Sequence, residues 1–170
     1  MNNLLGIMSG RLSYPINNKI QAFPYKTWMN EFKIAEDLGL SCIEWIYEHP
    51  NKNHNPICSN EGIKELKNLS RQHNISINSL VADNFMKDPL CNTNSKILNR
   101  SIDLLNYLIK QCLKAGIQMV ELPLMGKTSI RNKNNRNELV INIRDSLDYA
   151  KERNIKIVFE TDLPPSDFLV

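Results

Sequence analysis

The sequence predicts an α/β protein made of parallel (β/α) units of a TIM barrel, with about five of the eight strands present, that is, a partial barrel. Two observations lead to this prediction. Short apolar runs alternate with segments of helical periodicity along the whole chain. The apolar runs also begin about 35 to 40 residues apart, which is close to the average β/α unit of such a barrel. We expect residues 1–170 to form a single partial domain of this kind.

Five apolar runs rich in Ile, Val or Leu are expected to form buried strands, because continuous runs of this type are typical of parallel sheets. They are Leu4–Met8, Cys42–Tyr47, Ser76–Ala82, Gln118–Leu124 and Lys156–Glu160. Crossover connections between parallel strands are right-handed, and in a barrel they place consecutive strands side by side in chain order.

The segments between these runs carry apolar residues three or four positions apart, which predicts four helices. Glycines after the first and third segments, Gly39 and Gly116, are expected to end those helices. Ser59 or Asn60 is expected to cap the second. The apolar positions run from Trp28 to Leu38, from Ile63 to Leu69, from Ile102 to Leu113 and from Leu139 to Ala150.

An open, doubly wound sheet of five parallel strands is the alternative fold. It would need a glycine-rich phosphate loop after the first strand and a helix after the last. Neither pattern occurs, since the fifth apolar run is followed only by the segment LPPSDFLV. The partial barrel is therefore the preferred prediction.

The composition excludes several classes of protein. The chain has 170 residues and a formal net charge of +3, and its basic residues are scattered, which argues against a nucleic-acid partner. The apolar runs are far shorter than the ~20 residues that span a bilayer, and no signal-peptide pattern opens the chain. The four cysteines form no CxxC pair, which favours reduced thiols. We expect a cytoplasmic protein that binds neither nucleic acid nor membrane.

Functional groups of parallel α/β folds gather at the carboxyl ends of the strands. Glu160 is the leading candidate there, because the run IKIVFETD is apolar until its last residues and then presents a carboxylate. Such a carboxylate can bind a hard divalent cation or act as a base beside a bound substrate. A purely structural ion pair or cap is the alternative role for this residue.

Three further residues are candidates for binding a substrate. Glu44 and Glu121 lie within predicted buried strands, where an unpaired carboxylate is costly, so each must face a polar site or a cation. Arg11, which follows the first strand, could pair with them or hold a phosphate or carboxylate of a substrate. Internal ion pairs that only stabilise the fold are the alternative interpretation.

Several blocks of the chain resemble the xylose-isomerase-like barrel superfamily, whose members are also called sugar phosphate isomerases/epimerases. The first blocks are SGRLS at Ser9–Ser13 and IQAFP at Ile20–Pro24. The segment WMNEFKIAEDLGLSCIEWIYE is similar to the family pattern W-x-x-E-F, A-x-x-L-G and I-E-W-I. The blocks NPI, LVADNFMKDPL, VELPLMGKTS and IVFETDLPP extend the resemblance over essentially the whole chain.

The resemblance implies a TIM barrel whose mouth binds one divalent ion, such as Mn, Co, Mg or Zn, and a small sugar or sugar phosphate. It further implies that the ion is held by a Glu after strand five, an Asp after strand six, a His after strand seven and a Glu after strand eight, and that the two glutamates move the proton. Glu160 matches the first of these positions. The other three would lie beyond Val170, so we expect this chain to be the amino-terminal part, to be inactive alone and to bind no ion tightly.

Two classes of function follow from this comparison. The first is a metal-dependent sugar or sugar-phosphate isomerase or epimerase, provided that the full barrel is present. The second is a non-catalytic remnant that binds a ligand or partner, with self-association through its exposed strand edges. An endonuclease-like relative is a weaker alternative, because such a site needs several zinc-binding histidines and the chain has only 3.

Overall fold

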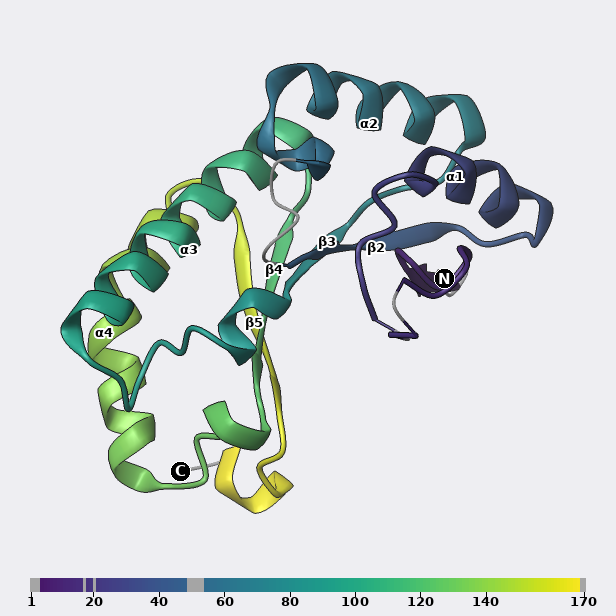
Figure 1. The fold of residues 1–170 in the computed structure, drawn as a ribbon. Coiled ribbons are helices and arrows are strands. Elements are labelled where there is room, and N and C mark those ends of the chain that lie inside the picture. Colours follow the sequence, from purple (N-terminus) through teal and green to yellow (C-terminus); the bar gives the residue numbers. More distant parts are fainter. Residues whose placement is uncertain (1–3, 17, 20, 49–53, 169–170) are drawn as a thin grey trace.

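The computed structural model describes residues 4–16, 18–19, 21–48 and 54–168, and within them strands and α-helices alternate (Figure 1). The strands are β1 (Gly6–Met8), β2 (Cys42–Tyr47), β3 (Ser79–Ala82), β4 (Met119–Leu124) and β5 (Lys156–Thr161). The α-helices are α1 (Trp28–Asp37), α2 (Asn60–His73), α3 (Ser95–Ala115) and α4 (Lys133–Lys151). Short 3-10 helices follow β3, β4 and β5 and precede α2; they are η3 (Asp83–Met86), η4 (Gly126–Thr128), η5 (Pro165–Phe168) and η2 (Pro56–Cys58).

The strands form one parallel sheet in the order β1-β2-β3-β4-β5. The order in space is the order in the chain, as the barrel prediction requires. A doubly wound sheet would instead place β1 in the middle and reverse direction there. The prediction of a partial barrel is therefore confirmed and the alternative fold is excluded.

Three strands begin later than predicted: β4 by one residue, at Met119, and β1 and β3 by two or more. β1 begins at Gly6, and Leu4 and Leu5 are 65% and 64% exposed. β3 begins at Ser79, because Ser76 makes only an isolated bridge to Cys42. In both cases single backbone hydrogen bonds to the neighbouring segment, such as that from the Ser41 amide to the Leu5 carbonyl, continue beyond the regular ladder of the strand. β2 begins and ends where the sequence predicts.

The predicted helix ends are also confirmed. Ser59 caps α2, since its hydroxyl accepts a hydrogen bond of 2.9 Å from the amide of Gly62. Gly116 ends α3 with a φ of 82°, a left-handed conformation that glycine adopts without steric cost. No helix in the described part of the chain is both long and apolar enough to cross a membrane.

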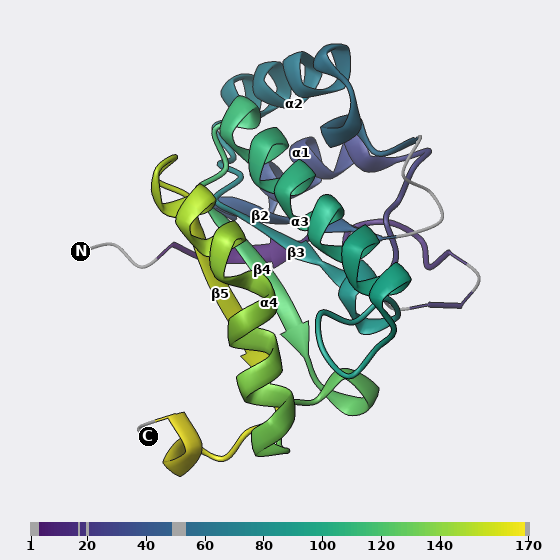
Figure 2. The same ribbon diagram turned by 90° about the vertical axis from the view of Figure 1, so that its left-hand side faces the viewer.

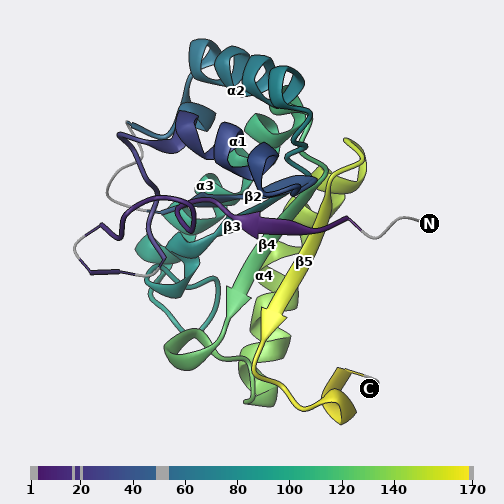
Figure 3. The same cartoon turned by 90° about the vertical axis from the view of Figure 1, so that its right-hand side faces the viewer.

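All four α-helices cover the same face of the sheet (Figure 2), and the opposite face is left open (Figure 3). The core lies between the sheet and this helical layer. Trp45 of β2 is at its centre, with ring centroids 5.4 Å from Phe23, 5.7 Å from Trp28 and 6.4 Å from Phe32. Because side chains alternate along a strand, Glu44, which precedes Trp45, faces the open side of the sheet.

A buried asparagine fixes the chain beyond β2. The Asn55 side chain accepts a 2.9 Å hydrogen bond from the Trp45 indole N–H and donates one of 2.9 Å to the carbonyl of Ile46. It also accepts from the amide of Ile57 at 3.2 Å, which starts η2. The NPI block is thus attached to the IEWI block, and a polar side chain that is 3% exposed has its hydrogen bonds satisfied.

Candidate functional site

The three candidate glutamates lie on the open face of the sheet. Glu44 accepts a 2.7 Å hydrogen bond from the Ser79 hydroxyl on the neighbouring strand. Val81, two residues after Ser79, is in register with Glu121. Glu160 pairs with Pro123, which is two residues after Glu121. Since every second residue of a strand has the same orientation, Glu44, Glu121 and Glu160 share one face, and Glu160 lies furthest toward the carboxyl end.

The mutual repulsion of these carboxylates is strongest at Glu121. Its pKa is raised to about 7, first by burial and then by the negative charges of Glu44 and Glu160. The interaction with the Glu160 side chain and the weaker effect of the Asp83 charge raise it further. Glu121 is therefore partly protonated near neutral pH. Glu121 and Glu160 lie on adjacent strands, two register positions apart on the same face.

The long segment between β1 and α1 crosses the carboxyl ends of β2 and β3. The Gln21 amide donates a 3.0 Å hydrogen bond to Oδ1 of Asp83, which directly follows β3. Two residues on, the amide of Phe23 donates one of 2.9 Å to Oε1 of Glu48, which directly follows β2. We refer to residues 21–24 as the crossing segment. It forms a wall of the mouth on the side of β2 and β3.

Burial raises the pKa of Asp83, and the hydrogen bond from Gln21 partly offsets this shift. The charges of Glu48 and Glu160 raise it further. Four strands thus contribute acidic side chains that influence one another: Glu44 and Glu48 from β2 and its end, Asp83 after β3, Glu121 from β4 and Glu160 from β5.

Arg11 occupies a different place from these carboxylates. Its side chain is exposed, and no hydrogen bond or ion pair joins it to Glu44, Glu121 or Glu160 among the contacts of these described residues. It lines a groove of about 450 Å³ on the far side of its own loop, between this loop and α1; Leu12, Ser13, Tyr14, Pro15, Thr27, Asn30 and Ile34 line the rest of it. A role for Arg11 in substrate binding stays a prediction.

Glu31 fixes the loop that carries Arg11. This α1 residue is 1% exposed, and its carboxylate accepts hydrogen bonds of 2.8 and 3.0 Å from the amide of Gly10 and of 3.2 Å from that of Leu12. Gly10 has a φ of 92°, and a Cβ atom there would lie 2.3 Å from the carbonyl oxygen of Ala22. Sequence analysis did not single out Glu31, and the signal for it was its place in the W-x-x-E-F pattern.

Asp162, two residues after Glu160, is bound by Ser129 and Arg131. Its Oδ1 accepts a 2.7 Å hydrogen bond from the Ser129 hydroxyl, and Arg131 lies 3.6 Å from Oδ2. The hydrogen bond from Ser129 and, to a smaller extent, the Arg131 charge lower the pKa of Asp162. The GKTS segment, which ends in Ser129, therefore orders the chain after β5.

The residues described here do not form a complete metal site. No group of three or more His, Cys, Asp or Glu side chains in the described part of the chain is placed to hold one ion. A hard divalent cation requires about six oxygen ligands, so Glu160 and its neighbours do not meet that requirement by themselves.

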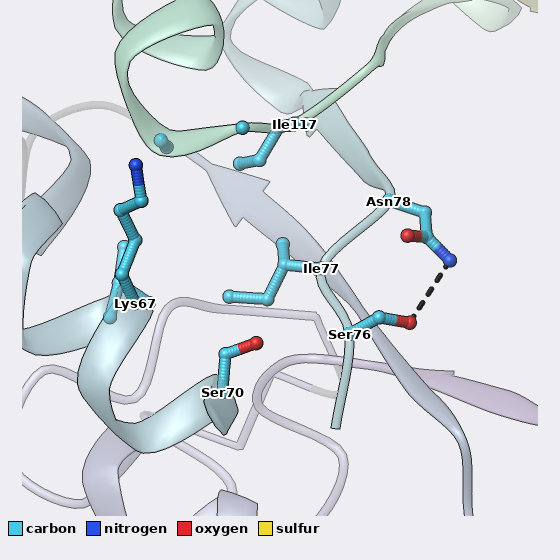
Figure 4. Close-up of a pocket in the computed structure, with 9 residues that line it drawn as sticks. Lys67, Ser70, Ser76, Ile77, Asn78 and Ile117 are labelled. Atoms are coloured by element: carbon cyan, nitrogen blue, oxygen red, sulfur yellow. Dashed lines mark hydrogen bonds between the residues drawn. The ribbon is translucent and has the colours of Figure 1, made fainter. Parts of the chain in front are cut away.

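A cavity of about 170 Å³ lies at the opposite, amino-terminal end of the sheet (Figure 4). It lies between α2 and the turns that precede β3 and β4, where Lys67, Ser70, Ser76, Ile77, Asn78 and Ile117 are among its lining residues. Its volume is below the roughly 300–1,000 Å³ of typical ligand pockets. The Asn78 amide already donates a 3.1 Å hydrogen bond to the Ser76 hydroxyl. The open face of the sheet is therefore the better candidate for function.

Comparison with known families identifies the fold. The model of the family "Xylose isomerase-like TIM barrel" matches residues 32–167. The chain belongs to this family. The resemblance inferred from the sequence blocks is thereby confirmed. A search of curated proteins finds no significant sequence match.

Solved structures of the xylose isomerase-like fold superpose on nearly the whole chain. A xylose isomerase domain protein from Planctomyces limnophilus has a TM-score of 0.64 at 13% identity, covering 97% of this chain and 56% of that one. D-Psicose 3-epimerase from Clostridium cellulolyticum H10, solved with D-tagatose, has a TM-score of 0.66 at 14% identity, covering 91% and 51%. The IolI protein with a bound zinc atom has a TM-score of 0.63 at 16% identity, covering 91% and 51%. The chain thus spans about half the length of these structures.

Neutralising Glu121 should stabilise the fold at alkaline pH. Below the usual glutamate pKa of 4.5 the carboxyl is neutral in both the folded and the unfolded state, so it has no effect there. As the pH rises from 4.5 through about 7, ionisation becomes more costly in the folded state than in the unfolded state, so folding stability is lost. At pH 8, Glu121→Gln should therefore raise the free energy of unfolding by about 1 kcal/mol, discounted for partial exposure.

Urea unfolding at pH 8 and pH 4.5 measures this difference. The gain should be present at the higher pH and absent at the lower one. The exposed Glu65 of α2 provides the control, because Glu65→Gln should leave the stability unchanged at both pH values. A Glu121→Gln variant that is less stable than the wild type at pH 8 would contradict the arrangement of carboxylates described here.

Proposed function

We propose that this chain forms the amino-terminal part of a metal-dependent isomerase or epimerase acting on a small sugar. The observation that carries the proposal is the position of Glu160, a carboxylate at the carboxyl end of β5 on the same face of the sheet as Glu121 of the adjacent strand. Family membership supports the reaction class, and so do structurally similar proteins such as D-psicose 3-epimerase and L-ribulose 3-epimerase.

Glu160 is the proposed proton acceptor. Isomerisation and epimerisation beside a carbonyl both begin with removal of a proton from the adjacent carbon, which a carboxylate within hydrogen-bond reach can accept. Glu121, which is partly protonated near neutral pH, can share that proton. Glu44, on the same face and bonded to Ser79, is proposed to bind a substrate hydroxyl.

Glu160 is also proposed as one ligand of a divalent ion. The zinc bound in the IolI structure supports a metal in proteins of this fold. Further ligands must come from groups outside the described residues, since these hold no complete site. We therefore propose that residues 1–170 on their own bind Mn²⁺ weakly and turn over no sugar.

A second candidate function is binding of a protein partner or a second copy through the edges of the sheet. Within the described residues, β1 pairs with β2 alone and β5 pairs with β4 alone, so these two strands are the edges of the sheet. Apolar side chains are exposed near both edges: Leu4 and Leu5 before β1, and Phe159 on β5 at 41%. Such edges favour pairing with further strands.

The proposed reaction can be followed by exchange of carbon-bound protons with D₂O. The natural polypeptide, including any residues that its gene encodes after Val170, is incubated with Mn²⁺ and D-tagatose or D-psicose. We expect deuterium at the carbon next to the carbonyl, detected by NMR. Glu160→Gln should reduce the exchange rate by a factor of about 100 or more, because it removes the proton acceptor at nearly constant volume.

Glu65→Gln is the matched control and should exchange at the wild-type rate. Absence of exchange with these sugars and their phosphates would refute the proposed reaction. The 170-residue chain is titrated with Mn²⁺ by calorimetry in parallel. Micromolar, stoichiometric binding that disappears in Glu160→Gln would show that a complete site already exists in this chain.

A further inference from the structure

We propose that Gln21 and Asp83 form a hydroxyl-binding pair that determines specificity for a sugar without a phosphate group. This inference rests on the proposed function and deepens it, because it assigns substrate contacts to two residues on different structural elements. The Gln21 amide lies in the crossing segment, and the Asp83 carboxylate directly follows β3.

The pair is held in place before any ligand arrives. Its own hydrogen bond, from Nε2 of Gln21 to Oδ1 of Asp83, measures 3.0 Å. The neighbouring hydrogen bond from the Phe23 amide to Glu48 fixes the crossing segment at a second point. Phe23 itself is fully buried against Trp45, with ring centroids 5.4 Å apart, so the segment cannot lift without exposing an aromatic ring.

The two side chains keep groups available for a ligand. Gln21 retains one amide N–H and its carbonyl oxygen, and Asp83 retains its second carboxylate oxygen; both side chains are partly exposed. A planar amide beside a carboxylate offers one donor and two acceptors in a fixed arrangement. Adjacent hydroxyls of a sugar, each of which both donates and accepts, match that arrangement.

The turn after β3 also contains a buried hydrogen-bond acceptor that has no donor. Asn84 is 4% exposed, and its Oδ1 atom has no hydrogen-bond partner. An unsatisfied buried carbonyl oxygen is unfavourable, so the end of β3 lacks at least one donor group. A water molecule that bridges this enclosed oxygen to a bound hydroxyl would supply it.

The charges around the pair disfavour a phosphate. Glu48 and Glu160 both act on Asp83 with negative charge, and the opposing effect of Lys87 is the weakest of those acting on it. The ion pairs among the described residues involve none of the five acidic side chains at the strand ends, Glu44, Glu48, Asp83, Glu121 and Glu160. A dianionic phosphate beside Asp83 would therefore be repelled by these carboxylates, and no basic side chain of the described residues is paired with them to offset the repulsion, whereas a neutral hydroxyl would not be repelled.

The test is an NMR titration of the ¹⁵N-labelled 170-residue chain with D-tagatose, D-fructose and D-fructose 6-phosphate. We expect the free sugars to shift the Gln21 side-chain amide signals and the backbone amides of residues 83–85. Gln21→Ala and Asp83→Asn should each weaken binding about tenfold, which corresponds to the loss of one hydrogen bond. The phosphorylated sugar should bind at least about tenfold more weakly than D-fructose.

Gln72→Ala, on the exposed surface of α2, is the control and should bind like the wild type. Asp83→Asn keeps the shape of the side chain, so the variant should fold, and its amide spectrum checks that it does. Gln21→Ala tests the same pair from the other side. Sugar binding that neither variant weakens would overturn this inference while leaving the proposed reaction untouched. Equal or tighter binding of the phosphorylated sugar would overturn the assigned substrate class. Absence of any shift with either free sugar would also overturn the pair as a binding site, while the exchange assay judges the reaction separately.

Discussion

Parallel pairing in chain order is the constraint on which the candidate site depends. Side chains alternate between the two faces of a strand, so neighbours in register share a face. The pairs Val81–Glu121 and Pro123–Glu160, together with the bond between Ser79 and Glu44, place the carboxylates of β2, β4 and β5 on the face that the helices leave open. A register shift of one residue would move a carboxylate into the helix-covered core, where ionisation is costly.

The segment between β1 and α1 completes the mouth through hydrogen bonds between distant sequence blocks. Glu31 of the WMNEF block holds the SGRLS loop by the amides of Gly10 and Leu12. Gln21 of the IQAFP block reaches Asp83 of the LVADNFM block. The blocks that suggested the family are thus blocks that contact one another. Their function here is to fix the walls of the mouth around the strand ends.

The sequence was sufficient to predict the order of the strands, the helix ends and the place of Glu44, Glu121 and Glu160, because all of these follow from periodicity and from the rule for strand ends. It was not sufficient to predict the partners of Glu31 or Gln21. The segment between β1 and α1 has no periodic pattern, so its path depends on tertiary contacts such as the burial of Phe23. The position of Arg11 depends on the path of this segment as well. The sequence suggested that Arg11 could pair with the glutamates, whereas in the structure it lines a groove beside α1.

Carboxylates from separate strands interact on one face of the sheet, and a titration of Glu121 measures that interaction. The side-chain carboxyl signal of ¹³C-labelled Glu121 is followed against pH in metal-free buffer. The account predicts a pKa of about 7 in the wild type and a value closer to the usual 4.5 in Glu160→Gln and in Glu44→Gln, since each substitution removes one neighbouring charge. A wild-type pKa near 4.5, or a raised value that neither substitution changes, would contradict it.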